Sequence, residues 1–255
     1  MRDGRIVIGL GTGRSGTGSL ARLLNAQPDS LCFHEMNPAC VRFAGTPRPI
    51  LNGVEEFARI LTHGDPSRVT VDLTRQSGIW TYDRLRQMTA VRLIGDVASY
   101  YLSYVRAIAE RHPTVRFLCM RRDVAETVRS WMEKTRIKRW RSLYVADRLS
   151  SLITRRPFYR SENFWMEHAG TEWRHSPLWD KLFPKFEAST KEDAIRQFCA
   201  YYYAEADRLE AELEGRLRFV DLSRFNDPDY QAEVLSFVGI PAAEQVRMPV
   251  HVRSR

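Results

Sequence analysis

A glycine-rich stretch near the amino end has the residue types of an anion-binding loop. It reads GLGTGRSGTGS over residues 9–19, between an apolar run and a helix-forming segment. Glycines let a backbone turn tightly with its N–H groups pointing inward, and a helix that follows adds free N–H groups and the positive end of its dipole. The pattern predicts a cradle for a phosphate-like anion, formed by Gly13, Arg14, Ser15, Gly16, Thr17, Gly18 and Ser19.

The spacing within this loop narrows the kind of anion. Gly11 and Gly16 have the separation of a Walker A loop, but Thr17 stands at the lysine position and Gly18 at the Mg²⁺-binding hydroxyl position, which disfavours an ordinary ATPase or kinase. The dinucleotide fingerprint GxGxxG does fit, and Glu35 stands where a ribose-binding acid is expected. An NAD-type oxidoreductase therefore remains the alternative, using Gly11, Gly13 and Gly16.

A second phosphate site is indicated further along the chain, in the sequence MRRDVAETVRSWM, residues 120–132. Arg122 follows an apolar run, and Ser130 lies eight residues later on the expected helix. A guanidinium and a hydroxyl converging there can hold a second, separate phosphate. A nicotinamide dinucleotide does not require such a site.

The elements that must position these residues alternate in an α/β rhythm. Buried-type strands are expected at 5–10, 31–35, 69–73, 91–94, 115–120 and 217–222, and helices at 17–27, 54–62, 98–111, 123–134, 190–214 and 229–238. Together they predict one α/β domain over residues 1–255, with a mostly parallel central sheet of about five strands.

Composition is typical of a globular protein. The chain has 255 residues, 44% of them hydrophobic and 27% charged, which excludes a disordered or collagen-like protein. The four cysteines form no CxxC pair, so free thiols and a cytoplasmic location are expected. Neither a signal peptide nor an apolar run long enough to span a membrane is found.

Positive charge is concentrated in one segment. Residues 133–160 contain nine basic and two acidic side chains, a balance of +7 within a net charge of +8. A polyanionic ligand, an acidic substrate, a nucleic acid or a solvated helical face would each explain this. We interpret residues 135–190, which are basic and rich in tryptophan, as a helical lid over the sheet, and place binding of single-stranded nucleic acid below that reading.

The two phosphate motifs together resemble those of the sulfotransferase superfamily, in its Golgi-type and bacterial branch. GTGRSGTGSL is similar to the 5′-phosphosulfate loop of that family, and FLCMRRDVAETVRSW to its 3′-phosphate motif. LIGDVASYYLSYVRAIAERHP, RFVDL and VLSFVGIP are similar to later sections. The resemblance runs along nearly the whole chain and is weakest over 135–190.

The resemblance implies a P-loop-like, three-layer α/β fold and the donor 3′-phosphoadenosine 5′-phosphosulfate, PAPS, with PAP as its product and no metal. It implies that residues 14–19 wrap the 5′-phosphosulfate and that Arg122 and Ser130 hold the 3′-phosphate. Arg14 stands where relatives carry a basic residue that stabilises the bridging oxygen. A sugar, peptide or small-molecule hydroxyl, or an amine, is the expected acceptor, with no nucleic acid as partner.

The general base is expected just after the second strand, in SLCFHEMNP. Relatives of the Golgi-type carry a glutamate there, which implies Glu35 as the base, while His34 is its rival because cytosolic relatives use histidine. Two positions depart from the family pattern: Gly18 replaces a threonine, and Val97 replaces the lysine of GDK. A basic residue of 134–141 is our candidate to replace that missing charge.

Overall fold

The apolar runs form a five-stranded, all-parallel sheet in the computed structural model, which describes residues 4–36, 47–73, 76–134, 153 and 191–249. Its strand order is β2-β3-β1-β4-β5. The strands are β1 (Arg5–Leu10), β2 (Ser30–His34), β3 (Leu93–Val97), β4 (Arg116–Arg121) and β5 (Leu217–Asp221). Five of the six β1 residues are buried, as expected for a parallel strand covered on both faces.

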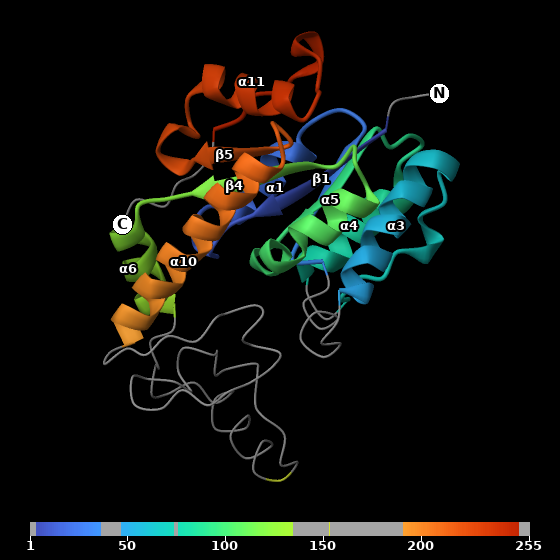
Figure 1. Cartoon of the computed structure of the whole chain (residues 1–255). Helices are drawn as coiled ribbons and strands as arrows, with labels where there is room; N and C mark the ends of the chain where they lie inside the picture. Colours follow the sequence, from blue (N-terminus) through green and yellow to red (C-terminus); the bar gives the residue numbers. More distant parts are fainter. Residues whose placement is uncertain (1–3, 37–46, 74–75, 135–152, 154–190, 250–255) are drawn as a thin grey trace.

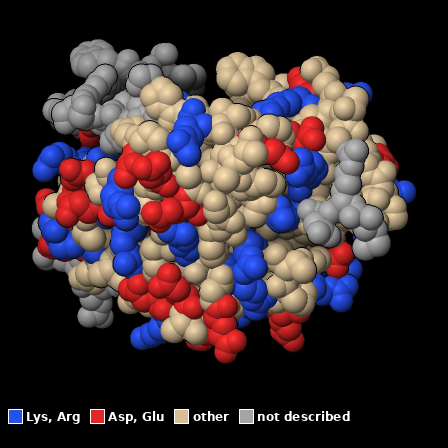
Figure 2. Space-filling view, turned by 90° about the horizontal axis from the view of Figure 1, so that it is seen from above, with Lys and Arg blue, Asp and Glu red and all other residues tan. Residues whose placement is uncertain are grey.

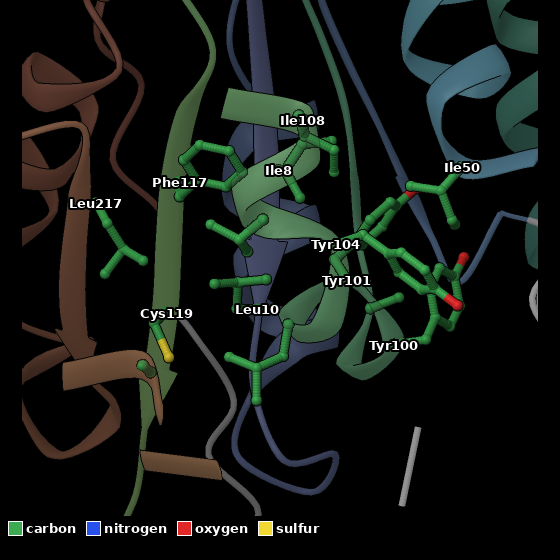
Figure 3. Packing of buried hydrophobic residues seen from close by; sticks show 14 of the residues in the cluster. Ile8, Leu10, Ile50, Tyr100, Tyr101, Tyr104, Ile108, Phe117, Cys119 and Leu217 are labelled. Atoms are coloured by element: carbon green, nitrogen blue, oxygen red, sulfur yellow. The ribbon is translucent and has the colours of Figure 1, made fainter. Parts of the chain in front are cut away.

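Helices cover both faces of the sheet and make a three-layer fold (Figure 1). One apolar cluster joins the sheet to α1 (Thr17–Asn25) and α11 (Pro228–Phe237). The other joins it to α3 (Arg48–His63), α4 (Gln76–Gln87), α5 (Val105–Arg111), α6 (Val124–Lys134) and α10 (Lys191–Glu212). Figure 3 shows part of this second cluster, with Ile8 and Leu10 of β1 beside Phe117 of β4.

The parallel register brings three predicted functional segments to one edge. His34 pairs with Val97, and Val97 with Gly9, so β2, β3 and β1 end together. Leu10 pairs with Cys119, which brings the end of β4 close by. In an open parallel sheet the ligand-binding crevice lies outside these carboxyl ends. The glycine loop, the His34–Glu35 segment and the start of α6 are therefore neighbours.

The predicted α/β class and mostly parallel sheet are confirmed, and three elements differ from expectation. Residues 69–73 form no strand: the Glu56 carboxylate accepts a hydrogen bond from Thr70 N at 2.9 Å, and Asp72 N donates to Met36 O at 2.8 Å, beyond the end of β2. The predicted helix 98–111 divides into a 3₁₀ segment, η2 (Ser99–Tyr104), and α5. Helix α4 was not expected from its sequence. Short 3₁₀ turns complete the fold: η1 (Pro66–Arg68), η3 (Leu222–Arg224) and η4 (Ala242–Glu244).

The face shown in Figure 2 carries acidic and basic side chains side by side. The excess positive charge falls mainly in 133–160. Nearly all of that segment, like the predicted lid 135–190, lies outside the described residues. The single-domain assignment of 1–255 stays a prediction.

Candidate functional site

The anion cradle, residues 13–19, joins β1 to α1. Gly13 and Gly16 have φ of 71° and 100°, in the left-handed region that favours glycine. Gly16 is the N-cap of α1, and neither a side-chain cap nor an acidic residue occupies the first turn of that helix. The N–H groups at this helix end and the positive end of its dipole are thus left for an anion.

The cradle also contains a buried hydroxyl with unused bonding capacity. Ser15 is fully buried, and its Oγ has no hydrogen-bond partner in the described part of the chain. An unpartnered buried polar group costs free energy, and an anionic oxygen would satisfy it. Opposite, Gly18 leaves space: a Cβ built there would approach nothing closer than the His34 ring, at 3.9 Å. These features fit a phosphosulfate-type anion.

Two side chains from other elements hold the cradle in shape. Tyr202 of α10 accepts a hydrogen bond from Gly11 N at 2.9 Å and donates to Ser99 O at 3.1 Å. Trp131 of α6 packs against the loop, since a Cβ on Gly13 would come within 2.8 Å of its ring. The loop is therefore fixed from two helices before any ligand binds, which lowers the cost of ordering it.

The predicted second site contacts the cradle directly. Arg14 Nε donates to Ser130 Oγ at 3.0 Å, and Arg122 Nη1 donates to the carbonyl oxygen of Arg14 at 3.0 Å. We call these residues the Arg14–Ser130–Arg122 cluster. Arg122 also donates from Nε to Glu126 at 3.0 Å. Arg14 of the cradle is thus bonded to both predicted residues of the second phosphate site, Ser130 and Arg122, so the two predicted sites are adjacent.

The turn between β4 and α6 orients this cluster. Asp123 accepts from Glu126 N at 2.9 Å and so caps α6. Tyr203 of α10 accepts from Arg122 N at 3.2 Å. Adjacent tyrosines of one helix therefore hold both phosphate-site loops. Burial raises the pKa of Tyr203 to about 12, so its phenol stays protonated at neutral pH.

His34 and Glu35 follow β2 and face the cradle differently. His34 Nε2 lies 3.1 Å from Thr17 Oγ1, at the first helical residue after the cradle's N-cap. Glu35 is half-buried, with φ of 55° and its N–H donated to Val97 O at 3.1 Å. A non-glycine residue in this region carries backbone strain, which is concentrated at functional sites. Contact with Thr17 places His34 beside the predicted anion site.

The buried carboxylate of Asp96 fixes the backbone of Met36, the residue after Glu35. Asp96 of β3 is fully buried, and both of its oxygens accept from Met36 N, at 3.2 and 3.1 Å. Tyr100 and Tyr101 donate to Asp96 Oδ2 at 2.9 and 2.8 Å. Burial raises the pKa of Asp96, against the effect of these bonds and of nearby His34. The exit of β2, which carries His34 and Glu35, is therefore held from the strand beside it.

The contacts that several of these residues make were not predicted from the sequence. Trp131, Tyr202 and Tyr203 act through contacts between elements far apart in the chain, and a tyrosine run on an amphipathic helix is typical of core packing. Asp96 had a weak signal, as an acid inside the apolar run LIGDV. Val97, where the family lysine was expected, is fully buried, and its side chain fills the space above Gly9.

No group of three potential metal-ligating side chains gathers anywhere in the part of the chain that the structure describes. Within those same ranges, no helix has both the length and the apolarity to cross a membrane. Cys32, Cys119 and Cys199 are free and buried.

Comparison with known proteins agrees with the site. The profile of the Sulfotransferase family matches residues 6–175, and the chain belongs to that family. It is therefore a sulfotransferase in the broad sense, and this assignment does not favour the NAD-type alternative. A crystal structure of a sulfotransferase from Alicyclobacillus acidocaldarius aligns with a TM-score of 0.47 and 16% identity, over 99% of this chain and 86% of that one. No curated protein sequence matches the chain significantly.

Proposed function

We propose that this protein transfers a sulfuryl group from PAPS to a hydroxyl or amine acceptor, with Glu35 as general base. The observation that carries the proposal is the contact between the anion cradle and the Arg14–Ser130–Arg122 cluster. A donor with separate 5′-phosphosulfate and 3′-phosphate groups needs two anion sites of this kind within one nucleotide length. A nicotinamide dinucleotide needs only the first.

Each residue then has a defined task. The amides of the cradle and the Ser15 hydroxyl bind the 5′-phosphosulfate, while Ser130 and Arg122 bind the 3′-phosphate. Arg14, which contacts Ser130 in the structure, lies between the two groups and stays charged at any working pH. Donors aimed at oxygens that gain charge supply most of the catalysis in transfers of this type.

The acceptor side depends on Glu35. When bound, the donor supplies the sulfuryl group, and PAP leaves with the electron pair of the broken S–O bond. The acceptor oxygen or nitrogen forms the new bond to sulfur in line with the leaving group, and its proton passes to the Glu35 carboxylate. His34, beside Thr17, orients the sulfuryl oxygens, with Glu35 nearer the acceptor.

Titration calorimetry tests the donor. PAP, 5′-AMP, NAD and a short oligonucleotide are each titrated into the wild type, the double variant Arg122→Ala/Ser130→Ala, and Arg129→Ala as an exposed control on the same helix. We expect PAP to bind at least about tenfold more tightly than 5′-AMP, and this preference to vanish only in the double variant. NAD or the oligonucleotide binding while PAP does not would refute the proposal.

A transfer assay with labelled PAPS across acceptor classes tests the base. Once an acceptor is found, Glu35→Gln should lower kcat by roughly 10²- to 10⁴-fold with PAP affinity unchanged, the size expected for loss of a general base. His34→Gln should have a smaller effect. The reverse order of the two variants would assign the base to His34.

A further inference from the structure

A pocket of about 240 Å³ lies beside the exit of β2, on the side away from the cradle. We call it the α3 pocket; its wall includes Met36, Arg48, Ile50, Gly53, Tyr100 and Tyr101. Figure 3 shows the rings of Tyr100 and Tyr101 on the side of the core that faces Ile50. The pocket is not part of the predicted donor site.

One glycine, Gly53, indicates that this space is kept open. Six described glycines have ordinary φ, and a Cβ on four of them, Gly4, Gly9, Gly78 and Gly95, would come within 3.0 Å of another atom. Gly18 and Gly53 are the exceptions. Gly53 lies inside α3, where glycine weakens a helix relative to alanine, and an added Cβ would meet only Met36 Cε, at 3.5 Å. Neither backbone conformation nor packing explains it.

These two glycines lie on opposite sides of one short turn. Gly18 faces the His34 ring in the cradle, and Gly53 faces Met36 in the α3 pocket. Only Glu35 separates His34 from Met36 in the chain, so the Cα atoms of these two residues lie within about 7 Å of each other. Asp96 holds the far end of the turn through Met36 N and also fixes Tyr100 and Tyr101, which line the pocket.

The wall of the pocket selects for an apolar occupant. The hydroxyls of Tyr100 and Tyr101 are used by Asp96, and both oxygens of Glu56 accept from Thr70. The buried residues of the lining are Met36, Ile50, Tyr100 and Tyr101, whereas Arg48 and Asn52 are exposed and Glu56 is bonded to Thr70 at the wall. Against the buried part of the lining, a sugar would leave hydroxyls without partners. A cavity of about 150 Å³ holds benzene, so this volume suits one or two rings.

We infer that the α3 pocket binds the acceptor, and that the acceptor is a small alcohol carrying one or two apolar rings, with its hydroxyl directed toward Glu35. This inference rests on the proposed function and assigns acceptor choice to α3 and η2, whereas the sequence pointed to 135–190. Sugar and peptide acceptors are the competing classes.

The test measures binding of 5-indanol and of methyl glucoside by calorimetry, with PAP present at saturation. Gly53→Leu fills the pocket, and Thr62→Phe adds as many heavy atoms at an exposed position of α3 outside the pocket wall. We expect 5-indanol to bind the wild type and Thr62→Phe alike, and Gly53→Leu to weaken it at least about tenfold. The affinity for PAP should stay the same in all three proteins.

Gly53→Ala separates binding from folding. The added methyl should raise Tm, because alanine favours the helix, and still weaken 5-indanol binding about threefold. Equal 5-indanol binding in Gly53→Leu and wild type, or binding of methyl glucoside in place of 5-indanol, overturns the inference while leaving the PAPS proposal intact. Failure of PAP to bind, with 5-indanol still lost in Gly53→Leu, overturns the donor proposal and keeps the pocket.

Discussion

Asp96 illustrates how one buried carboxyl group can hold the strand end that carries His34 and Glu35. It accepts bonds from a backbone N–H and two phenols while fully excluded from water. A buried carboxylate is tolerated only when its oxygens are satisfied in this way. Removing one of these donors therefore leaves a buried carboxylate oxygen without a partner, which destabilises the fold. It also loosens the segment after β2, because Met36 N is bonded to the same carboxylate.

The raised pKa of Asp96 gives a pH test. Because burial raises its folded pKa, the folded protein holds this proton more tightly, so the contribution to stability is complete below about pH 4 and is lost as pH rises through the folded value. The asparagine variant has no such proton to lose. We therefore expect the free energy of unfolding of Asp96→Asn, minus that of the wild type, to increase as pH rises. Urea unfolding from about pH 4.5 to 8 measures this; a constant difference would contradict it.

Gly13 provides a second test at the residue scale. Gly13→Ala combines a strained φ of 71° with a collision against Trp131. Gly64→Ala is the matched control, since Gly64 also has φ of 71° but no atom within 4 Å of the added Cβ. The control should lose only the left-handed cost of about 1–2 kcal/mol. Gly13→Ala should lose more and weaken PAP binding about tenfold or more; similar losses in both would contradict the contact.

At this scale the sequence was informative only where a motif acts locally. The glycine loop, Arg122 and Ser130 carry their meaning in spacing along one strand–turn–helix unit, and the structure brings them together. Trp131 against Gly13 and Tyr202 against Gly11 depend on helix positions that no local pattern encodes. The bond between Arg14 and Ser130 crosses two elements and was likewise not predicted.

Helix α10 connects the elements of the site. Tyr202 holds the glycine loop and η2, Tyr203 holds the start of α6, and Arg106 of α5 bonds to Glu205 and Glu212. The helix was predicted from its apolar spacing, but these contacts were not. The predicted strand 69–73 was wrong for a related reason. Its alternation of apolar and polar residues is typical of a strand, but the Glu56 carboxylate of α3 accepts a hydrogen bond from the Thr70 backbone N–H. That N–H is then not available to pair with a neighbouring strand.

Tyr202→Phe tests this connection. Loss of the hydroxyl leaves Gly11 N–H and Ser99 O without their partner, and each unsatisfied buried group costs about 1–3 kcal/mol. We expect the free energy of unfolding to fall by at least about 1–3 kcal/mol, the cost of one such group, and the affinity for PAP to fall as well. Tyr201→Phe, at a side chain 44% exposed on the same helix, should change stability by less than about 0.5 kcal/mol. Equal effects in the two variants would rule out the bridging role.

For the whole molecule, the strand order could not be deduced from the sequence, although the α/β class and the parallel sheet could. Placing β1 between β3 and β4 requires contacts between distant segments, such as Gly95 of β3 against Val7 of β1. Because the strands have similar apolar composition, the sequence does not indicate which of them occupies which position in the sheet. Only their packing in three dimensions distinguishes them.

Burial of the thiols is a property of this complete fold. It raises the pKa of Cys32 and Cys119, and that of Cys199 to about 12. Because the thiolate is the reactive form, we expect these three cysteines to resist a thiol reagent at about pH 8 until urea unfolds the protein. Peptide mapping after timed labelling measures each site; rapid native labelling of Cys199 would contradict the packing.

The neighbouring positions of α6 and α10 also bear on how this scaffold diversifies. The two helices lie side by side (Figure 1). The end of α6 at residue 134 and the start of α10 at residue 191 are therefore on the same flank of the sheet. Closing a longer loop costs little extra free energy. We expect a connecting segment of a different length between these points to leave the strand register unchanged.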